Sequence, residues 1–167
     1  MGKLFLLCGK PGSGKTTLAK SLKEKFGLIH FSADDFMLKL FGEIENRDLF
    51  DKKLKAIKDL IYQICDDVLV SNNVVLDFGF WTKIEREELK NRFKNNKVIV
   101  VYLKLDDEKI FSQIENRNSN LKENEYFMDL NTFKILSSKF EEPTIDECVI
   151  CENNTKFVEE FKQFLDR

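Results

Sequence analysis

The stretch Gly9-Lys-Pro-Gly-Ser-Gly-Lys-Thr16 decides the fold, because it matches the pattern G-x-x-x-x-G-K-[ST] without a gap. Before it lies Lys3–Cys8, a continuous apolar run typical of a strand that is buried on both faces. After it, apolar residues recur every four positions, which predicts a helix over residues 14–26. A strand before the pattern and a helix after it indicate a phosphate-binding loop rather than a glycine-rich turn with an exposed lysine.

Each position of this loop has a chemical reason. The glycines allow backbone conformations that a Cβ would block, so that the amide N–H groups can point inward and bind an anion at the helix N-terminus. Lys15 is expected to reach the β- and γ-phosphates of ATP, and the hydroxyl of Thr16 is expected to bind Mg²⁺. The predicted ATP-binding residues are Gly9, Lys10, Pro11, Gly12, Ser13, Gly14, Lys15, Thr16 and Thr17.

Strand and helix patterns alternate along the rest of the chain, which predicts an α/β fold with a parallel sheet covered by helices on both faces. The predicted strands cover residues 3–8, 28–31, 74–77, 98–103 and 148–151. The predicted helices cover residues 14–26, 34–41, 49–69, 83–93, 106–117, 132–140 and 154–165. The polar segment 118–131 breaks the alternation and is interpreted as a short lid. We therefore expect one domain over residues 1–167.

Composition and charge exclude several classes of protein. The chain has 167 residues, of which 43% are hydrophobic and 34% charged, an ordinary globular composition. A formal net charge of −2 does not favour a broadly basic nucleic-acid binder. No apolar run approaches the ~18 residues of a transmembrane helix, so we expect a cytoplasmic monomer or weak dimer without a membrane partner. The pair Cys148 and Cys151 lacks the further ligands of a zinc site and is expected in a buried strand.

Three carboxylates follow predicted strands, where ligands of doubly wound sheets collect. Asp77 ends the apolar run 74–76 and is expected to hold Mg²⁺, the alternative being a cap for the helix that starts near Thr82. Asp34 and Asp35 follow the second strand. One of them is expected to cap the next helix, and the residues alone leave open whether either is a general base that accepts the proton of a substrate hydroxyl.

Two arginines are candidates for contact with the reacting groups. Arg117 ends a predicted helix and opens the polar lid, so it is expected to close over the transferred phosphoryl group. The alternative is a solvated arginine that the helix dipole favours. Arg86 lies past the turn after the third strand and could face the substrate or pair with Glu85 or Glu87. The candidate substrate contacts are Asp35, Trp81 and Arg86.

Taken together, the chain resembles the small P-loop kinases that include zeta toxins, chloramphenicol phosphotransferase, gluconate kinase and the kinase domain of polynucleotide kinase. It is also similar to bacterial ATP-binding proteins of this type that are labelled as AAA domains. The resemblance rests on residues 6–19, 32–36, 75–81 with Arg86, 102–103, 116–118, 140–143 and 146–147. It implies a five-stranded parallel sheet of order 2-3-1-4-5 with a lid, as in nucleoside monophosphate kinases. It also implies that Asp34 is the catalytic base and that Arg117 is the lid arginine, acting with Lys15.

Two departures from these relatives bear on the substrate. Nucleoside monophosphate kinases carry an arginine in the turn after the third strand, which grips the substrate phosphate. Here that turn is Asp77-Phe-Gly-Phe-Trp81, which argues against a nucleoside monophosphate as the acceptor. Relatives often place an arginine against adenine one turn before the lid arginine, and here that position is Gln113. A preference for ATP over GTP is therefore implied by the resemblance alone.

The leading hypothesis is an ATP- and Mg²⁺-dependent kinase that phosphorylates a hydroxyl of a small molecule. Its acceptor is expected to bind among Phe36, Phe78, Phe80 and Trp81. One alternative is a polynucleotide 5′-hydroxyl kinase, which needs a basic groove for the nucleic-acid backbone. The residues available for such a groove are Lys52, Lys53, Lys55 and Lys58. The other alternative is a nucleotide-binding switch with little transfer activity.

Overall fold

A computed structural model describes residues 1–121, 126–152 and 154–166 of the chain. The strands are β1 (Lys3–Cys8), β2 (Ile29–Ser32), β3 (Val74–Gly79), β4 (Lys97–Leu103) and β5 (Val149–Cys151). The helices are α1 (Lys15–Phe26), α2 (Ala33–Phe41), α3 (Arg47–Val68), α4 (Lys83–Arg92), α5 (Asp107–Ser119), α6 (Leu130–Ser137), α7 (Asn154–Glu160) and α8 (Lys162–Asp166).

The five strands form one parallel sheet in the order β2-β3-β1-β4-β5, which confirms the predicted fold class and strand order. The central strand β1 is buried on both sides, as its unbroken apolar run predicts. The register sets Ser32 beside Asp77 and Cys8 beside Gly79. Because all strands point the same way, the phosphate loop, Asp77 and the start of α2 meet at one edge of the sheet.

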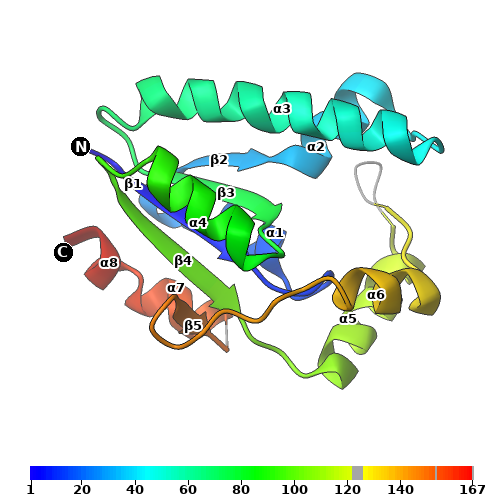
Figure 1. Cartoon of the computed structure of the whole chain (residues 1–167). Coiled ribbons are helices and arrows are strands. Elements are labelled where there is room, and N and C mark those ends of the chain that lie inside the picture. Colours follow the sequence, from blue (N-terminus) through cyan, green and yellow to red (C-terminus); the bar gives the residue numbers. More distant parts are fainter. Residues whose placement is uncertain (122–125, 153, 167) are drawn as a thin grey trace.

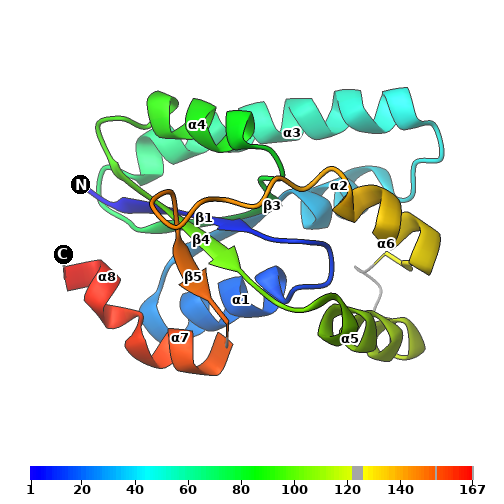
Figure 2. The ribbon, with the colours of Figure 1, turned by 60° about the horizontal axis from the view of Figure 1, so that its bottom comes forward.

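Helices cover both faces of the sheet (Figures 1 and 2). Leu4 and Leu6 of β1 face α3 and α4, where they join one core cluster with Ile61 and Leu89. Phe5 and Leu7 point to the opposite face and join the cluster covered by α1, α7 and α8. Helices α5 and α6 lie beyond the strand ends and pack on each other through a separate small core. They therefore stand over the edge at which the phosphate loop lies.

The helix boundaries differ from expectation where tertiary packing or caps decide them. Helix α2 is capped by Ser32, whose Oγ accepts a hydrogen bond from the N–H of Asp35 at 3.3 Å, so the expected aspartate cap was wrong. Helix α5 runs on through Ser119 into the segment interpreted as a lid. Of that segment, residues 122–125 lie outside the described residues. The single expected C-terminal helix is split into α7 and α8 at the fully buried Phe161.

The four cysteines are free thiols. Cys8, Cys65 and Cys151 are buried, as expected for small apolar side chains. Cys148 is half-buried and lies one residue before β5, so the expectation that it belongs to a buried strand was wrong. Within the described part of the chain, no group of three or more metal-binding side chains gathers in one place. The described helices include none that is long and apolar enough to cross a membrane.

Candidate active site

The phosphate loop has the conformation that its glycines predict. Gly12 has a φ of 78°, and a Cβ there would stand 2.6 Å from Ile114 of α5. The loop therefore needs glycine for its backbone angle and for the close approach of α5. Helix α1 begins directly after the loop, so its first N–H groups face the space that a phosphate group would enter.

Lys15 bridges the loop from inside. Its Nζ donates to the carbonyls of Gly9 at 3.0 Å and Lys10 at 2.9 Å. Burial lowers the pKa of Lys15 below its ordinary value, while the carboxylates of Asp77 and Asp34 act in the opposite direction. The ammonium is thus positioned among backbone groups and carboxylates at the edge of the sheet, where a phosphate chain would compete for it.

Thr16 and Asp77 form the oxygen pair that the sequence predicts as a Mg²⁺ site. The Thr16 hydroxyl donates to Oδ2 of Asp77 at 2.6 Å. Asp77 does not cap α4, because Thr82 does so with Glu85 in a reciprocal capping box. Magnesium is commonly held by one or two protein oxygens together with phosphate oxygens and waters, and this pair fits that chemistry. A larger cluster of protein ligands is not needed.

Asp34 and Asp35 lie in the first turn of α2, on the same cleft as Lys15. Desolvation in the cleft, and then the nearby Asp77 carboxylate, raise the pKa of Asp34, whereas Lys15 and Lys58 act to lower it. A carboxylate with a raised pKa is a stronger base than an ordinary aspartate, as a proton acceptor requires. Asp35 also lines the cleft, and its backbone N–H is used by the Ser32 cap.

Arg117 extends from α5 into the cleft. Its Nε and Nη2 are buried and have no hydrogen-bond partner among the described residues. The buried hydroxyl of Tyr126 is also unpaired within the described chain, and burial and then the charge of Asp34 raise the pKa of Tyr126. Buried donors normally find partners, so these groups point to a ligand that supplies acceptor oxygens.

One cavity of about 1500 Å³ connects these groups. It begins at the phosphate loop, passes Asp34, Asp77 and Arg117, and extends between the end of β3 and helix α3. At that far end its walls include Phe50, Leu54, Phe78, Trp81, Leu136 and Lys139. The cleft therefore has a phosphate end and a second end at which aromatic and aliphatic side chains stand among charged ones, including Arg47, Asp51, Lys58 and Glu85.

Only some of the residues that were expected to contact the substrate line the cleft in the structure. Asp35, Phe78 and Trp81 line the cleft, whereas Phe36 is outside it and Phe80 is buried in the core. Arg86 does not line the cleft: its side chain is fully buried and paired with Glu147 at 2.6 Å. The expectations that Arg86 faces substrate or pairs with Glu85 or Glu87 were both wrong.

The predicted basic row on α3 does not form a groove. Lys58 lies in the cleft beside Glu85 at 3.6 Å, and Lys55 pairs with Asp59 at 2.7 Å. The Nζ of Lys53 lies 3.7 Å from the centre of the Phe41 ring. Lys55 and Lys58 line one pocket between α3 and α4 together with carboxylates such as that of Asp59, so the basic side chains do not form an uninterrupted path for a nucleic-acid backbone.

Asn154 and Tyr126 are among the cleft residues that the sequence analysis did not name. Asn154 follows β5, and its side-chain Nδ2 donates to the carbonyl of Gly14 at 3.2 Å. The rule that ligands collect at the carboxyl ends of strands also covers β5, so it could have indicated Asn154. Tyr126 has no such signal, since its place in the cleft depends on how the chain returns from α5 to α6.

Solved structures share this fold. A protein from Chloroflexus aurantiacus j-10-fl superposes with a TM-score of 0.75 at 16% identity, covering 99% of this chain and 96% of that one. A gluconokinase from Sinorhizobium meliloti 1021 gives a TM-score of 0.66 at 16% identity, with 95% and 88% covered. At such identities the likeness concerns the fold alone.

Curated relatives include adenylate kinases. The chain is 31% identical over 128 residues to that of Agrobacterium fabrum, covering 68% of this chain and 64% of the relative. It is 42% identical over 66 residues to that of Stenotrophomonas maltophilia, covering 40% and 34%. The chain thus spans less than two thirds of the length of these relatives. The family model AAA_33, an AAA domain, matches residues 4–143, which contain the loop, Asp34, Asp77 and Arg117. The chain belongs to this AAA_33 family of P-loop domains.

Proposed function

We propose that this chain is an ATP- and Mg²⁺-dependent kinase that transfers the γ-phosphoryl group to a hydroxyl of a small molecule. The observation that carries the proposal is the meeting, in one cleft, of the phosphate loop, the Thr16–Asp77 pair, Asp34 and the guanidinium of Arg117, whose Nε and Nη2 have no partner among the described residues. Phosphoryl transfer requires this combination of charge neutralisation, a proton acceptor and positioning.

Each residue has a defined task in this reaction. The loop amides and Lys15 bind the β- and γ-phosphate oxygens, and Arg117 donates to the oxygens of the group in transfer. Asp34 accepts the proton of the acceptor hydroxyl as the new O–P bond forms and the bond to ADP breaks. Mg²⁺, held by Thr16 and Asp77, would neutralise charge on the phosphates. Burial and then the charge of Asp34 raise the pKa of Tyr126, and we assign to this residue of the cleft wall the orientation of the acceptor.

The second end of the cleft favours an acceptor without a phosphate group. The turn after β3 presents Phe78 and Trp81 and carries no arginine. Arg86 of α4 is already paired with Glu147, and Arg47 of α3, which lines the cleft, is paired with Asp51 at 2.9 Å. Because the chain is similar to adenylate kinases, AMP is the alternative acceptor that has to be tested. The absence of a continuous lysine path on α3 speaks against a polynucleotide acceptor.

A phosphorylation screen tests the proposal. Purified protein is incubated with Mg²⁺ and γ-labelled ATP, and with sugars, amino alcohols, nucleosides, AMP and a 5′-hydroxyl oligonucleotide. The expected result is a labelled small hydroxyl compound that is not formed by the Asp34→Asn variant. Transfer of the label to AMP or to the oligonucleotide would show that the acceptor is not a small hydroxyl compound without a phosphate group. Hydrolysis of ATP without any labelled acceptor would favour a nucleotide switch instead.

A further inference from the structure

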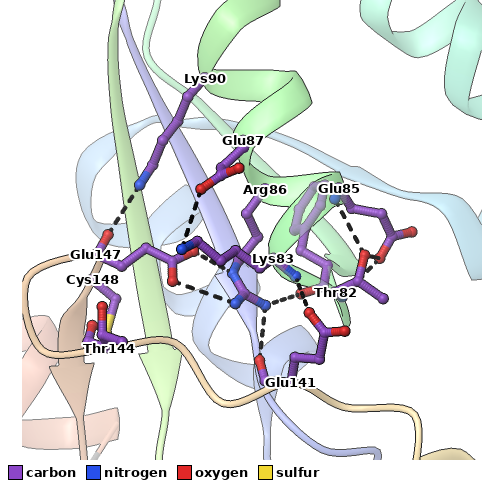
Figure 3. Close-up of polar contacts among 11 residues, drawn as sticks. Thr82, Lys83, Glu85, Arg86, Glu87, Lys90, Glu141, Thr144, Glu147 and Cys148 are labelled. Carbon is purple, nitrogen blue, oxygen red and sulfur yellow. Dashed lines mark hydrogen bonds and ion pairs between the residues drawn. The ribbon is translucent and has the colours of Figure 1, made fainter.

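Arg86 makes an unusual set of contacts for a residue outside the cleft (Figure 3). Its Nε donates to Oε1 of Glu147 at 2.6 Å, and its Nη2 lies 3.5 Å from the other carboxylate oxygen. Its Nη1 donates to the carbonyls of Phe80 and Glu141, each at 3.0 Å. The guanidinium thus joins α4 to two backbone segments, the turn after β3 and the segment between α6 and β5.

The first of these segments has a strained backbone. Phe80 has a φ of 42° and is the only non-glycine residue in the described chain with a positive φ. Gly79 has a φ of 88°, and a Cβ there would overlap the indole Nε1 of Trp81. A positive φ at a residue other than glycine, as at Phe80, persists only where the surroundings impose it. The hydrogen bond from Arg86 to the Phe80 carbonyl is one such constraint, and it acts next to Trp81 in the cleft wall.

The second segment is tied to the same turn by further bonds. The N–H of Glu141 donates to the carbonyl of Trp81 at 2.7 Å. The Glu141 carboxylate accepts from the N–H of Lys83 at 2.7 Å. Lys139, two residues before Glu141, lines the cleft. The turn that carries Trp81 and the segment that carries Lys139 are therefore joined by one network of hydrogen bonds, and Arg86 lies at its centre.

The charge of Arg86 is balanced without any group of the cleft. Burial alone would raise the pKa of Glu147, but the hydrogen bond and charge of Arg86 outweigh burial and hold it below its ordinary value. Lys90 adds a hydrogen bond to the Glu147 carbonyl at 3.2 Å. Because the ion pair is satisfied within the protein, Arg86 has no free charge to offer a substrate. Any effect on the reaction must pass through the segments that it holds.

We infer that Arg86, anchored by Glu147, is a positioning residue that fixes the Gly79–Trp81 turn and the segment around Lys139 as one rigid wall of the cleft. The inference rests on the proposed function in one respect only, namely that the acceptor binds against this wall. A guanidinium is suited to the task because its planar fork can serve a carboxylate and two carbonyls at the same time. A lysine ammonium keeps the charge but cannot span these three acceptors.

Trp81 makes the inference testable before the acceptor is known. It is the only tryptophan in the chain and lies in the turn that Arg86 holds. Quenching of its fluorescence by acrylamide measures how freely the turn opens. The variants are Arg86→Lys and Glu147→Gln. The control is Leu89→Ala, which removes an apolar side chain of the same helix from the core cluster that includes Phe80 but removes none of the hydrogen bonds to the turn. All are compared at a temperature where circular dichroism shows each to be folded.

We expect the Stern–Volmer constant to rise about twofold in Arg86→Lys and by a smaller factor in Glu147→Gln, through local opening of the turn. Leu89→Ala should leave it near the parent value, and ADP affinity, measured by calorimetry, should be unchanged in all three. Parent-like quenching in Arg86→Lys, or an equal rise in Leu89→Ala, would overturn the inference. Should Arg86→Lys fail to fold, the comparison of Glu147→Gln with Leu89→Ala decides.

Once an acceptor is identified, the same variants separate the two proposals. A raised acceptor KM with an unchanged ATP KM is the result expected of a loosened acceptor wall. Unchanged acceptor KM in a variant with increased quenching would overturn the link to the acceptor while leaving the kinase proposal intact. A failure of the kinase proposal, in turn, leaves the quenching result standing.

Discussion

The two ends of the cleft are built in opposite ways. At the phosphate end, nine consecutive residues, Gly9 to Thr17, form the loop and the first turn of α1, and the Nε and Nη2 donors of Arg117 have no partner in the part of the chain that the structure describes. At the other end, Trp81, Leu54 and Lys139 come from three separate parts of the chain. There Arg47 is paired with Asp51 and Lys58 lies 3.6 Å from Glu85, and the buried ion pair between Arg86 and Glu147 holds the walls.

This difference shows what each end requires. A triphosphate always has the same shape and charge, so one local backbone conformation can bind it. An acceptor varies in shape, so its site is set by side chains brought together from a distance and by the segments that support them. Substitutions at the phosphate end should therefore remove the chemistry, whereas those at the other end should change stability or acceptor binding.

The largest effect is expected for Lys15→Ala. Removing the ammonium eliminates a charge directed at the transferred group, which should lower phosphoryl transfer by about 10³-fold or more. The measurement is the rate of labelled product formation at saturating ATP. Lys23→Ala, an exposed lysine further along α1, is the matched control and should behave as the parent. Near-normal transfer by Lys15→Ala would refute the assignment of the loop.

A smaller but still large effect is expected for Asp34→Asn. Loss of the proton acceptor should lower kcat by about 10²-fold while ATP affinity is preserved. The neighbouring Asp35→Asn makes the same change one residue further along α2 and should have the smaller effect. Single-turnover rates of the two variants provide the comparison. If Asp35→Asn proved the more damaging, the base would have to be reassigned.

The smallest effect is expected at the supporting end and concerns stability. Arg86 holds the pKa of Glu147 below its ordinary value, so the folded carboxyl binds its proton less readily than the unfolded one. The contribution of the pair is therefore complete above the ordinary glutamate pKa of about 4.3 and is lost as pH falls through the lower folded pKa. Melting temperatures between neutral pH and about pH 3 should fall more steeply for the parent than for Glu147→Gln. If the melting temperatures of the parent and of Glu147→Gln fell equally with pH, the Arg86–Glu147 pair would not contribute to the pH dependence of stability.

Much of the fold could be predicted because its signals are local. The apolar run of β1, the periodicity of α1 and α3 and the alternation of elements each depend on nearby residues. Given an alternating pattern and a phosphate loop, the order of the sheet follows by resemblance, and the structure confirms it. The residues of the phosphate end could be predicted for the same reason, because they are consecutive in the sequence.

The errors fall where local signals compete or where partners are distant. Serine and aspartate are both favourable N-cap residues, and in the structure Ser32 rather than Asp34 or Asp35 occupies the N-cap position of α2. Arg86 has acidic neighbours in sequence, but its partner Glu147 is 61 residues away. No spacing rule relates the two, so the burial of Arg86 could not be inferred. The roles of Asp34 and Lys15 in the reaction remain predictions until the variants above are measured, and the role of Arg117 stays a prediction.

The distribution of thiols has a practical consequence for covalent chemistry on this molecule. Burial raises the pKa of Cys8 and of Cys65 to about 12, so neither supplies much thiolate to an alkylating reagent at neutral pH. Cys148 alone is half-buried, next to Glu147, and burial followed by that carboxylate raises its pKa as well. Maleimide labelling should therefore be slow and concentrated on Cys148, which would place a dye or spin label beside the anchor of Arg86 without an engineered cysteine.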